Sequence, residues 1–369
     1  MAPKNNIPAE VFPPGEFIRE ELEARGWSQA DFALIIERDT GLVSDIVSAK
    51  RSITPETASA IGQAFGTGGQ IWMNLESEYR LHLAEKNRPA ESDIASRARL
   101  FTEYPIRLMI KRGWIEPSDS IQVLESRSKD FFSPKIAFAA KMARKEDATP
   151  LQLAWLYRVY NIATRFPAGK YSEDKLQDSL VSLRNLMHER LEIRHIPTIL
   201  NAAGIRFLIV EPFPGSSIDG VCFWLDSKSP VVALSLRRDY IDNFWFTLIH
   251  ELKHVEHRHG LDKIFLDTDI IQKIRNETIP EEIQVNGETA EFLIPKRELD
   301  DFVIRIRPFF STAKIMGFAM RLGIHPGIVV GQLQHNSIIG WKQHRRFLEK
   351  IRSIITEIAV CDGWGNSIH

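Results

Sequence analysis

Five consecutive residues in the C-terminal half of the chain have the types and spacing that bind a metal ion: His250, Glu251, Leu252, Lys253 and His254. The two histidines are about one helical turn apart, so both imidazoles leave the same face of a helix and can hold one Zn²⁺. Glu251 lies about 100° round the helix from His250, where a carboxylate can act as general base. The pattern predicts the centre of a zinc-dependent peptidase.

The surroundings of this motif favour a metal site. The helix predicted over residues 239–257 is strongly apolar, so inward-facing histidines and a carboxylate would be costly to bury without a metal or other partners. A glutamate-rich helical segment at 281–292 offers Glu281, Glu282 or Glu288 as a third ligand, and catalytic zinc needs a third ligand and an open fourth position.

A competing interpretation treats His250 and His254 as ordinary helix residues of a histidine-rich stretch. His257 and His259 extend that stretch beyond the register of the motif, and we expect both of them to be surface residues. Tyr240 is considered, with His325, as a group that stabilises an oxyanion, although a structural role is expected for each.

The elements that must position the motif are a small sheet and the helix after it. β-like runs at 205–210, 221–225 and 231–236 are separated by glycines and a Ser-Pro pair, which indicates an α+β unit. We expect a substrate strand to pair beside 231–236, and the polar segment 262–277 to cover the centre as a loop or short helices.

The N-terminal part of the sequence predicts a different, all-helical unit. Its turn signals separate five short helices, which begin near residues 15, 29, 40, 55 and 69. Ser28 and Thr54 are predicted N-caps, whereas Gly26 and Gly66 are predicted helix stops. Two short helices joined by a tight turn within such a unit are typical of a helix-turn-helix.

These patterns predict a multidomain chain. Its parts are an all-α helix-turn-helix domain at 1–88, a helical middle region at 94–195 and an α+β zincin-like metallopeptidase domain at 196–369. Residues 86–93 are polar and contain Pro89, which indicates a linker. The middle region carries an amphipathic stretch at 151–163 and no polar constellation, so we expect a scaffold there.

The net charge, the cysteine content and the apolar segments of the sequence limit the ligands and the cellular compartment that we expect. The chain of 369 residues has 47 Lys+Arg against 48 Asp+Glu, so nucleic acid must be bound by a local patch. Its two cysteines provide no disulfide framework, and we find neither a signal peptide nor an apolar run that would span a bilayer. We therefore expect a cytoplasmic protein without membrane contact.

The motif and the residues around it resemble the ImmA/IrrE family of zinc metallopeptidases. The resemblance covers roughly 205–340 and rests on DNFWFTLIHELKH at 242–254, AEFLIP at 290–295 and GIHPGIVVGQLQ at 323–334. It implies Zn²⁺ bound by His250 and His254, Glu251 as general base, and Glu282 as third ligand because Glu282 lies four positions before Asn286. Lys253 departs from the family's usual glycine.

Residues 12–84 resemble the HigA/VapI group of XRE-type antitoxins. The resemblance rests on PGEF at 14–17, SQADFA at 28–33, RSITPETA at 51–58 and WMNL at 72–75. It implies a homodimer on operator DNA, and it places four residues at phosphates and base edges: Gln29, Thr40, Gly41 and Ser44. The module is acidic, because residues 1–90 hold 9 Lys+Arg and 13 Asp+Glu. Phosphate contacts therefore fall to Arg38, Lys50 and Arg51.

Two functions follow from these predictions. The first is a regulatory zinc endopeptidase with a DNA-binding module, whose substrate is a repressor or a toxin-system protein and whose action is restrained until the right partner appears. The alternative is a transcriptional repressor or antitoxin whose metallopeptidase-like domain is a sensor or scaffold without proteolytic activity.

Overall fold

The computed structural model describes residues 11–86, 93–133, 148–261, 264–268, 279–366 and 368, and it divides the chain into two compact units, Met1–Ser96 and Arg97–His369. The linker predicted at 86–93 lies almost entirely outside the described residues. No helix among the described residues is both long enough and apolar enough to cross a membrane.

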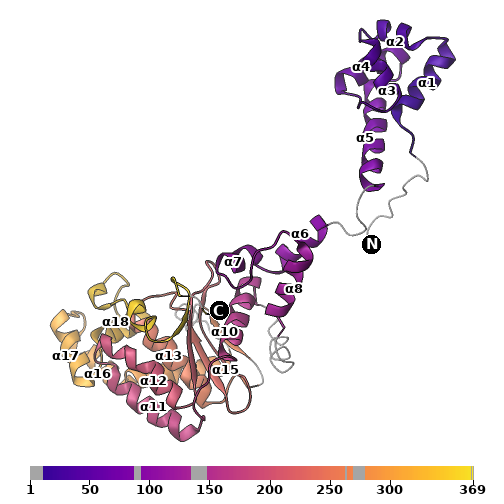
Figure 1. The fold of residues 1–369 in the computed structure, drawn as a ribbon. Helices are drawn as coiled ribbons and strands as arrows, with labels where there is room; N and C mark the ends of the chain where they lie inside the picture. Colours follow the sequence, from indigo (N-terminus) through magenta and orange to yellow (C-terminus); the bar gives the residue numbers. More distant parts are fainter. Residues whose placement is uncertain are drawn as a thin grey trace. The chain divides into compact units, whose positions relative to one another are not determined.

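The N-terminal unit is the predicted bundle of short helices (Figure 1): α1 (Pro14–Arg25), α2 (Gln29–Ile35), α3 (Thr40–Val47), α4 (Pro55–Phe65) and α5 (Gly69–Lys86). Ser28 forms a capping box with Asp31, which satisfies amides at the start of α2 that have no partner within the helix. Gly26 and Gly66 end α1 and α4 in the left-handed region, at φ 68° and 73°. The helix-turn-helix prediction is confirmed.

The core of this unit fixes one face of α3 and leaves the other exposed. Phe32 of α2 stacks on Phe65 of α4 with ring centroids 4.8 Å apart. Gly15 of α1 lies against α3, where an added Cβ would be 2.4 Å from the Val47 carbonyl oxygen. Because α3 turns its buried side to α1 and α2, Thr40 and Ser44 face solvent.

The second unit is built on a five-stranded mixed sheet in the order β4-β2-β3-β1-β5. The strands are β1 (Arg206–Val210), β2 (Ile218–Trp224), β3 (Pro230–Leu234), β4 (Phe265–Thr268) and β5 (Val360–Asp362). β1 runs parallel to β3 and β5, whereas β2 runs antiparallel to β3 and β4. The first three match the predicted strands, and the very short β4 and β5 were not predicted.

Helices cover both faces of the sheet (Figure 1). The face with Val231 and Ala233 packs on the middle region, which contains α6 (Asp93–Glu103), α7 (Ile106–Lys111), α8 (Ile121–Phe131) and α10 (Pro150–Ala163). The face with Val232 and Leu234 packs on the other helices. These are α11 (Glu173–Leu186), η1 (Arg190–His195), α12 (Ile196–Ala202), α13 (Ile241–Glu256), α15 (Pro280–Leu293), α16 (Lys296–Ile306), α17 (Thr312–Leu322), α18 (Pro326–His335), η2 (Arg345–Phe347) and α19 (Arg352–Ile355).

The multidomain fold class is confirmed, with a helix-turn-helix region, a helical middle region and an α+β region. The middle region shares a hydrophobic core with the sheet, and the Trp155 indole of α10 donates to the Val210 carbonyl oxygen at 3.0 Å. It also contains a buried polar pair that the sequence did not suggest, Arg158 with Asp362 of β5. The three domain boundaries stay predictions.

Candidate metal centre

Helix α13 holds the motif against the sheet. It packs against β2, β3, α15 and α18, and its apolar residues, among them Trp245 and Leu252, are buried. His250, Glu251 and His254 have no exposed surface. The amphipathic pattern thus places the apolar residues in the core, as predicted, but also directs all three motif side chains inward.

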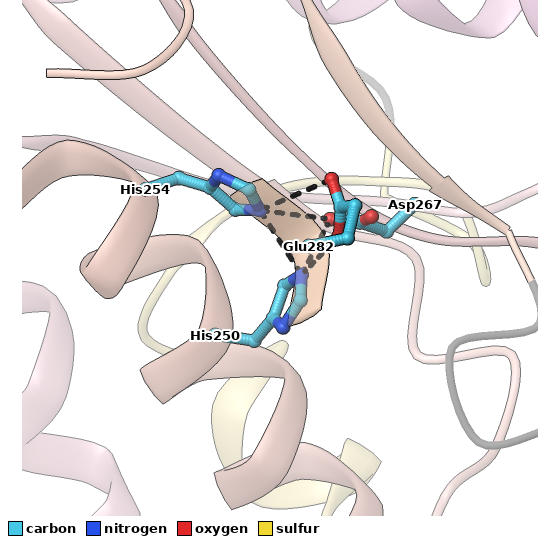
Figure 2. A group of neighbouring side chains, drawn as sticks. All are labelled: His250, His254, Asp267 and Glu282. Carbon is cyan, nitrogen blue, oxygen red and sulfur yellow. Dashed lines mark hydrogen bonds and ion pairs between the residues drawn. The ribbon is translucent and has the colours of Figure 1, made fainter. Parts of the chain in front are cut away.

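Four side chains converge at the centre (Figure 2): His250 and His254 of α13, Asp267 of β4 and Glu282 of α15. The two histidine Nε2 atoms are 3.1 Å apart. His250 Nε2 lies 3.2 Å from Asp267 Oδ2 and 3.3 Å from Glu282 Oε2. His254 Nε2 lies 4.0 Å from Asp267 Oδ2 and 3.6 Å from Glu282 Oε1.

These separations fit a tetrahedral zinc ion. Bonds of about 2.0–2.1 Å give tetrahedral edges of about 3.3 Å, close to the three distances from His250 Nε2 to the other donors, whereas the two distances from His254 Nε2 to the carboxylates are longer, at 3.6 and 4.0 Å. Two imidazoles and two carboxylates are also a normal zinc donor set. Asp267 Oδ2 is buried, and its contacts with the His250 and His254 Nε2 atoms are ion-pair contacts, so this carboxylate is stable only with positive charge in the centre. The residues present therefore fit a divalent metal.

The protein groups of the centre are strongly coupled electrostatically. Burial lowers the pKa of His250, but the carboxylates of Asp267 and Glu282 outweigh it and raise this pKa to about 9. Burial would raise the pKa of Asp267, yet the neighbouring His250 holds it below its usual range. These opposing shifts show that the cluster stabilises positive charge between its carboxylates.

Glu251 is not one of the four donors, and it lies under β2 next to Asp267. Both of its carboxylate oxygens are buried without a hydrogen bond. Burial, and then the negative charge of Asp267, raise the pKa of Glu251 well above its usual range. The Glu251 carboxylate therefore binds a proton more readily than an exposed glutamate does.

The glutamates of α15 separate clearly. Glu282 is buried in the cluster, Glu281 is exposed, and Glu288 accepts from His257 at 2.7 Å. Of the three candidates for the third ligand, the structure therefore brings only Glu282 to His250 and His254. The ligand and base roles of these residues stay predictions.

The neighbouring histidines do not behave alike. Both are half-exposed and neither is among the four converging donors; His257 contacts Glu288, whereas His259 Nδ1 is 2.9 Å from His254 Nδ1, a contact that the sequence did not suggest. This contact forms because the chain turns back after α13: the His259 amide donates to the His254 carbonyl oxygen at 2.8 Å. No spacing rule for helices predicts such a return.

Asp267 was missed, and two expectations about substrate binding need correction. Of the predicted cover at 262–277, only 264–268 are described, and they contain the strand β4 instead of a loop or short helices. β3 cannot pair with a substrate strand, because β2 and β1 already flank it. His325 is the N-cap of α18 and Tyr240 accepts from Arg345, so both have structural contacts.

The predicted DNA-contacting residues lie around α2 and α3. Thr40, Gly41 and Ser44 are exposed on α3, as are Arg38, Lys50 and Arg51 beside it, whereas Gln29 at the start of α2 is half-buried. Arg38, Gly41 and Arg51 line one hollow, which they share with Asp39 and Asp45. Asp39 also accepts from the Gly41 amide at 3.0 Å, so an acidic group caps the start of α3.

The two units define a helix-turn-helix module and a peptidase-like domain with a candidate metal centre. The helix-turn-helix family profile matches residues 18–72, and the profile described as the IrrE N-terminal-like domain matches residues 201–309. Virulence-associated protein I of Dichelobacter nodosus is 35% identical over 24% of this chain and 80% of its own length. The uncharacterized HTH-type transcriptional regulator YddM of Escherichia coli is 31% identical over 24% of this chain and 92% of its own.

The chain therefore belongs, through its N-terminal unit, to the helix-turn-helix family of these regulators, and it joins that unit to an ImmA/IrrE-like peptidase-family domain. Among solved structures, the Pseudomonas aeruginosa antitoxin HigA with the higBA promoter is 38% identical, over 20% of this chain and 83% of that one, with a TM-score of 0.20.

Proposed function

We propose that the protein is a regulatory zinc endopeptidase that a helix-turn-helix module brings to operator DNA. The observation that carries the peptidase half is the convergence of His250, His254 and Glu282 beside the buried Glu251. Bound zinc would polarise a peptide carbonyl and activate water for attack. His250, His254 and Glu282 would hold it, and the match to the IrrE N-terminal-like domain supports this assignment.

In this proposal Glu251 carries the proton transfer. Its carboxylate takes a proton from the attacking water and passes it to the leaving amine, and its raised pKa favours the first of these transfers. The substrate would be a repressor or a component of a toxin system, because the chain carries the regulatory module of such systems.

DNA binding is the second half of the proposal. The helix-turn-helix match and the exposure of Thr40, Gly41 and Ser44 on α3 support it. The two acidic residues in the hollow, Asp39 and Asp45, weaken the attraction to phosphates, so a homodimer that doubles the contacts would be the binding form.

A metal analysis combined with a Glu251→Gln comparison tests the peptidase half. Wild-type protein and Glu251→Gln should each bind about one zinc ion per chain. Only the wild type should cleave a repressor or toxin-system protein encoded nearby, and neither should degrade casein briskly. If the His250→Ala/His254→Ala double variant binds as much zinc as the wild type does, the metal site is assigned to the wrong residues.

A sensor or scaffold is the second candidate, and one observation favours it. Four protein donors converge at the centre, and structural zinc sites are closed by four protein ligands. If Glu251→Gln retains both zinc and the regulatory function, the domain is a sensor and the peptidase proposal fails.

A further inference from the structure

Asp267 approaches His250 as closely as Glu282 does, and it lies 4.0 Å from His254 Nε2, where Glu282 lies at 3.6 Å. Its Oδ2 is 3.2 Å from His250 Nε2, and the closest Glu282 oxygen to the same nitrogen is at 3.3 Å. We propose that Asp267 is a fourth protein ligand that closes the metal centre and holds the peptidase in a latent form. The proposal rests on the proposed zinc site, and it adds a residue and a restraint that the motif does not contain.

The strand that carries Asp267, β4, occupies the position beside β2 that an extended substrate peptide would occupy. β4 lies at the edge of the sheet and pairs antiparallel with β2, with Val221 opposite Leu266 and Gly220 opposite Asp267. Extended peptides bind proteins by adding such a strand to a free sheet edge. Without β4, the free edge would be that of β2, the strand against which Glu251 packs.

Local geometry aims Asp267 inward. Leu266 belongs to the core on the α10 face of the sheet, so alternation along the strand sends Asp267 to the α13 face. The pairing is irregular between Ile218 and Gly220, opposite Thr268 and Asp267. Bulges of this kind often redirect a side chain next to an active site.

The consequence is a centre in which the base is in place but no coordination position is open. Four protein donors complete a tetrahedron, whereas catalysis needs one position for water or a substrate carbonyl. A purely structural centre would give no reason to bury Glu251 with both oxygens lacking hydrogen bonds beside Asp267. Release of Asp267 would open a position directly beside that base.

The test uses full-length protein loaded with Zn²⁺ or Co²⁺. Zinc affinity is measured by competition with a chromophoric chelator, and the visible spectrum of the Co²⁺ form is recorded with and without acetohydroxamate, which needs an open coordination position. The variants are Asp267→Asn and Asp267→Ala, with Thr268→Ala as the control on the same strand and His254→Ala as the control for loss of a ligand. Circular dichroism checks that each is folded.

We expect the wild-type and Thr268→Ala spectra to be unchanged by hydroxamate. Both Asp267 variants should respond to it and bind zinc at least about tenfold more weakly. Wild-type affinity in both Asp267 variants, or a hydroxamate response in the wild type, would overturn the fourth-ligand assignment while the zinc site stands. Undiminished binding in His254→Ala would instead overturn the zinc site itself.

Discussion

Gly220 of β2 and Glu251 of α13 fit together so closely that no side chain can stand between them. A Cβ added at Gly220 would lie 2.1 Å from Glu251 Oε1 and 3.0 Å from its Cδ. β2 therefore lies directly against the buried carboxylate, and Asp267, the residue opposite Gly220 on β4, interacts with it as well. Glycine is required at position 220 for lack of space. Its φ is outside the left-handed region, so backbone conformation alone would allow other residues there.

This contact predicts strong coupling between the two positions. Gly220→Ala should reduce the free energy of unfolding by about 1–3 kcal/mol, because overpacking a buried contact forces its neighbours to shift. In a Glu251→Ala background the same change should cost almost nothing, and denaturant unfolding of the four proteins gives the coupling. Gly287→Ala, at a helical position where an added Cβ contacts nothing, is the control. Additive costs would show that the close contact is not real.

His259 should support the metal centre through His254. Burial, and then the charge of His254, lower the pKa of His259, so its neutral Nδ1 can accept the Nδ1 proton of His254 and leave His254 Nε2 free for a metal. His259→Ala should weaken zinc binding about 10–100-fold in a chelator competition assay. His257→Ala, which affects the contact with Glu288, should leave it unchanged; an equal loss in both variants would point to a general effect of the histidine-rich stretch.

The buried Arg158–Asp362 pair should be essential to the second unit. Arg158 Nε lies 2.9 Å from Asp362 Oδ2, which also accepts from the Trp114 indole at 2.8 Å. Asp362→Asn should cost about 3–5 kcal/mol in unfolding free energy, because the guanidinium remains buried without a counter-charge.

Two further variants define that comparison. Arg158→Met/Asp362→Leu, which removes both charges, should cost less than Asp362→Asn alone. Breaking the pair between Arg127 and the exposed Glu116 should cost no more than about 1 kcal/mol. If the double variant is instead the least stable protein, the ion pair makes a net contribution to the free energy of unfolding that exceeds the cost of burying its two charges.

Asp242 should make the protein less stable as the pH rises. Burial raises its pKa from 3.8 to about 6, so the folded state binds more protons than the unfolded state between these values. Stability therefore falls as the pH rises through this window, and the loss is complete above about pH 6. Asp242→Asn should gain roughly 2–3 kcal/mol relative to wild type between pH 4 and pH 8 in denaturant unfolding. A constant difference across that range would contradict the shift.

Arg38, Lys50 and Arg51 should carry the phosphate contacts of the N-terminal module. Removing any one of them should lower the slope of log affinity against log salt by about one, uniformly across DNA sequences. Arg80→Ala serves as control, since Arg80 already pairs with Glu76 at 2.7 Å. If the N-terminal module keeps its helical content but binds no DNA even at low salt, it does not serve DNA binding, and contact with another protein becomes its proposed function.

Local rules predicted the helices of the N-terminal unit and the convergence of the two histidines. Ser28, Gly26 and Gly66 act within a few residues of their own position, and the spacing of His250 and His254 is a property of one helix. Glu282 could be predicted only from the family resemblance, because its approach depends on how α15 packs on α13.

The residues that sequence reasoning missed depend on long-range pairing. Asp267 lies in a strand of four residues whose placement comes from β2, and Asp362 lies in a strand of three residues that joins β1 from the far end of the sequence. Such short strands carry too little alternation to be recognised alone. The pairing of β4 with β2 and of β5 with β1 brings Asp267 to α13 and Asp362 to α10. No local sequence pattern encodes this pairing.

Arg158 and Asp362 are 204 positions apart in the sequence, and this separation has a consequence for the order in which a newly synthesised molecule folds. While the ribosome is translating the segment between them, Arg158 has been made but its counter-charge has not, so α10 cannot dock on the sheet without burying an unpaired cation. The helix-turn-helix unit, whose contacts are local, can fold long before that moment. The nascent chain would therefore fold its helix-turn-helix unit first, and the second unit only after Asp362 has been made.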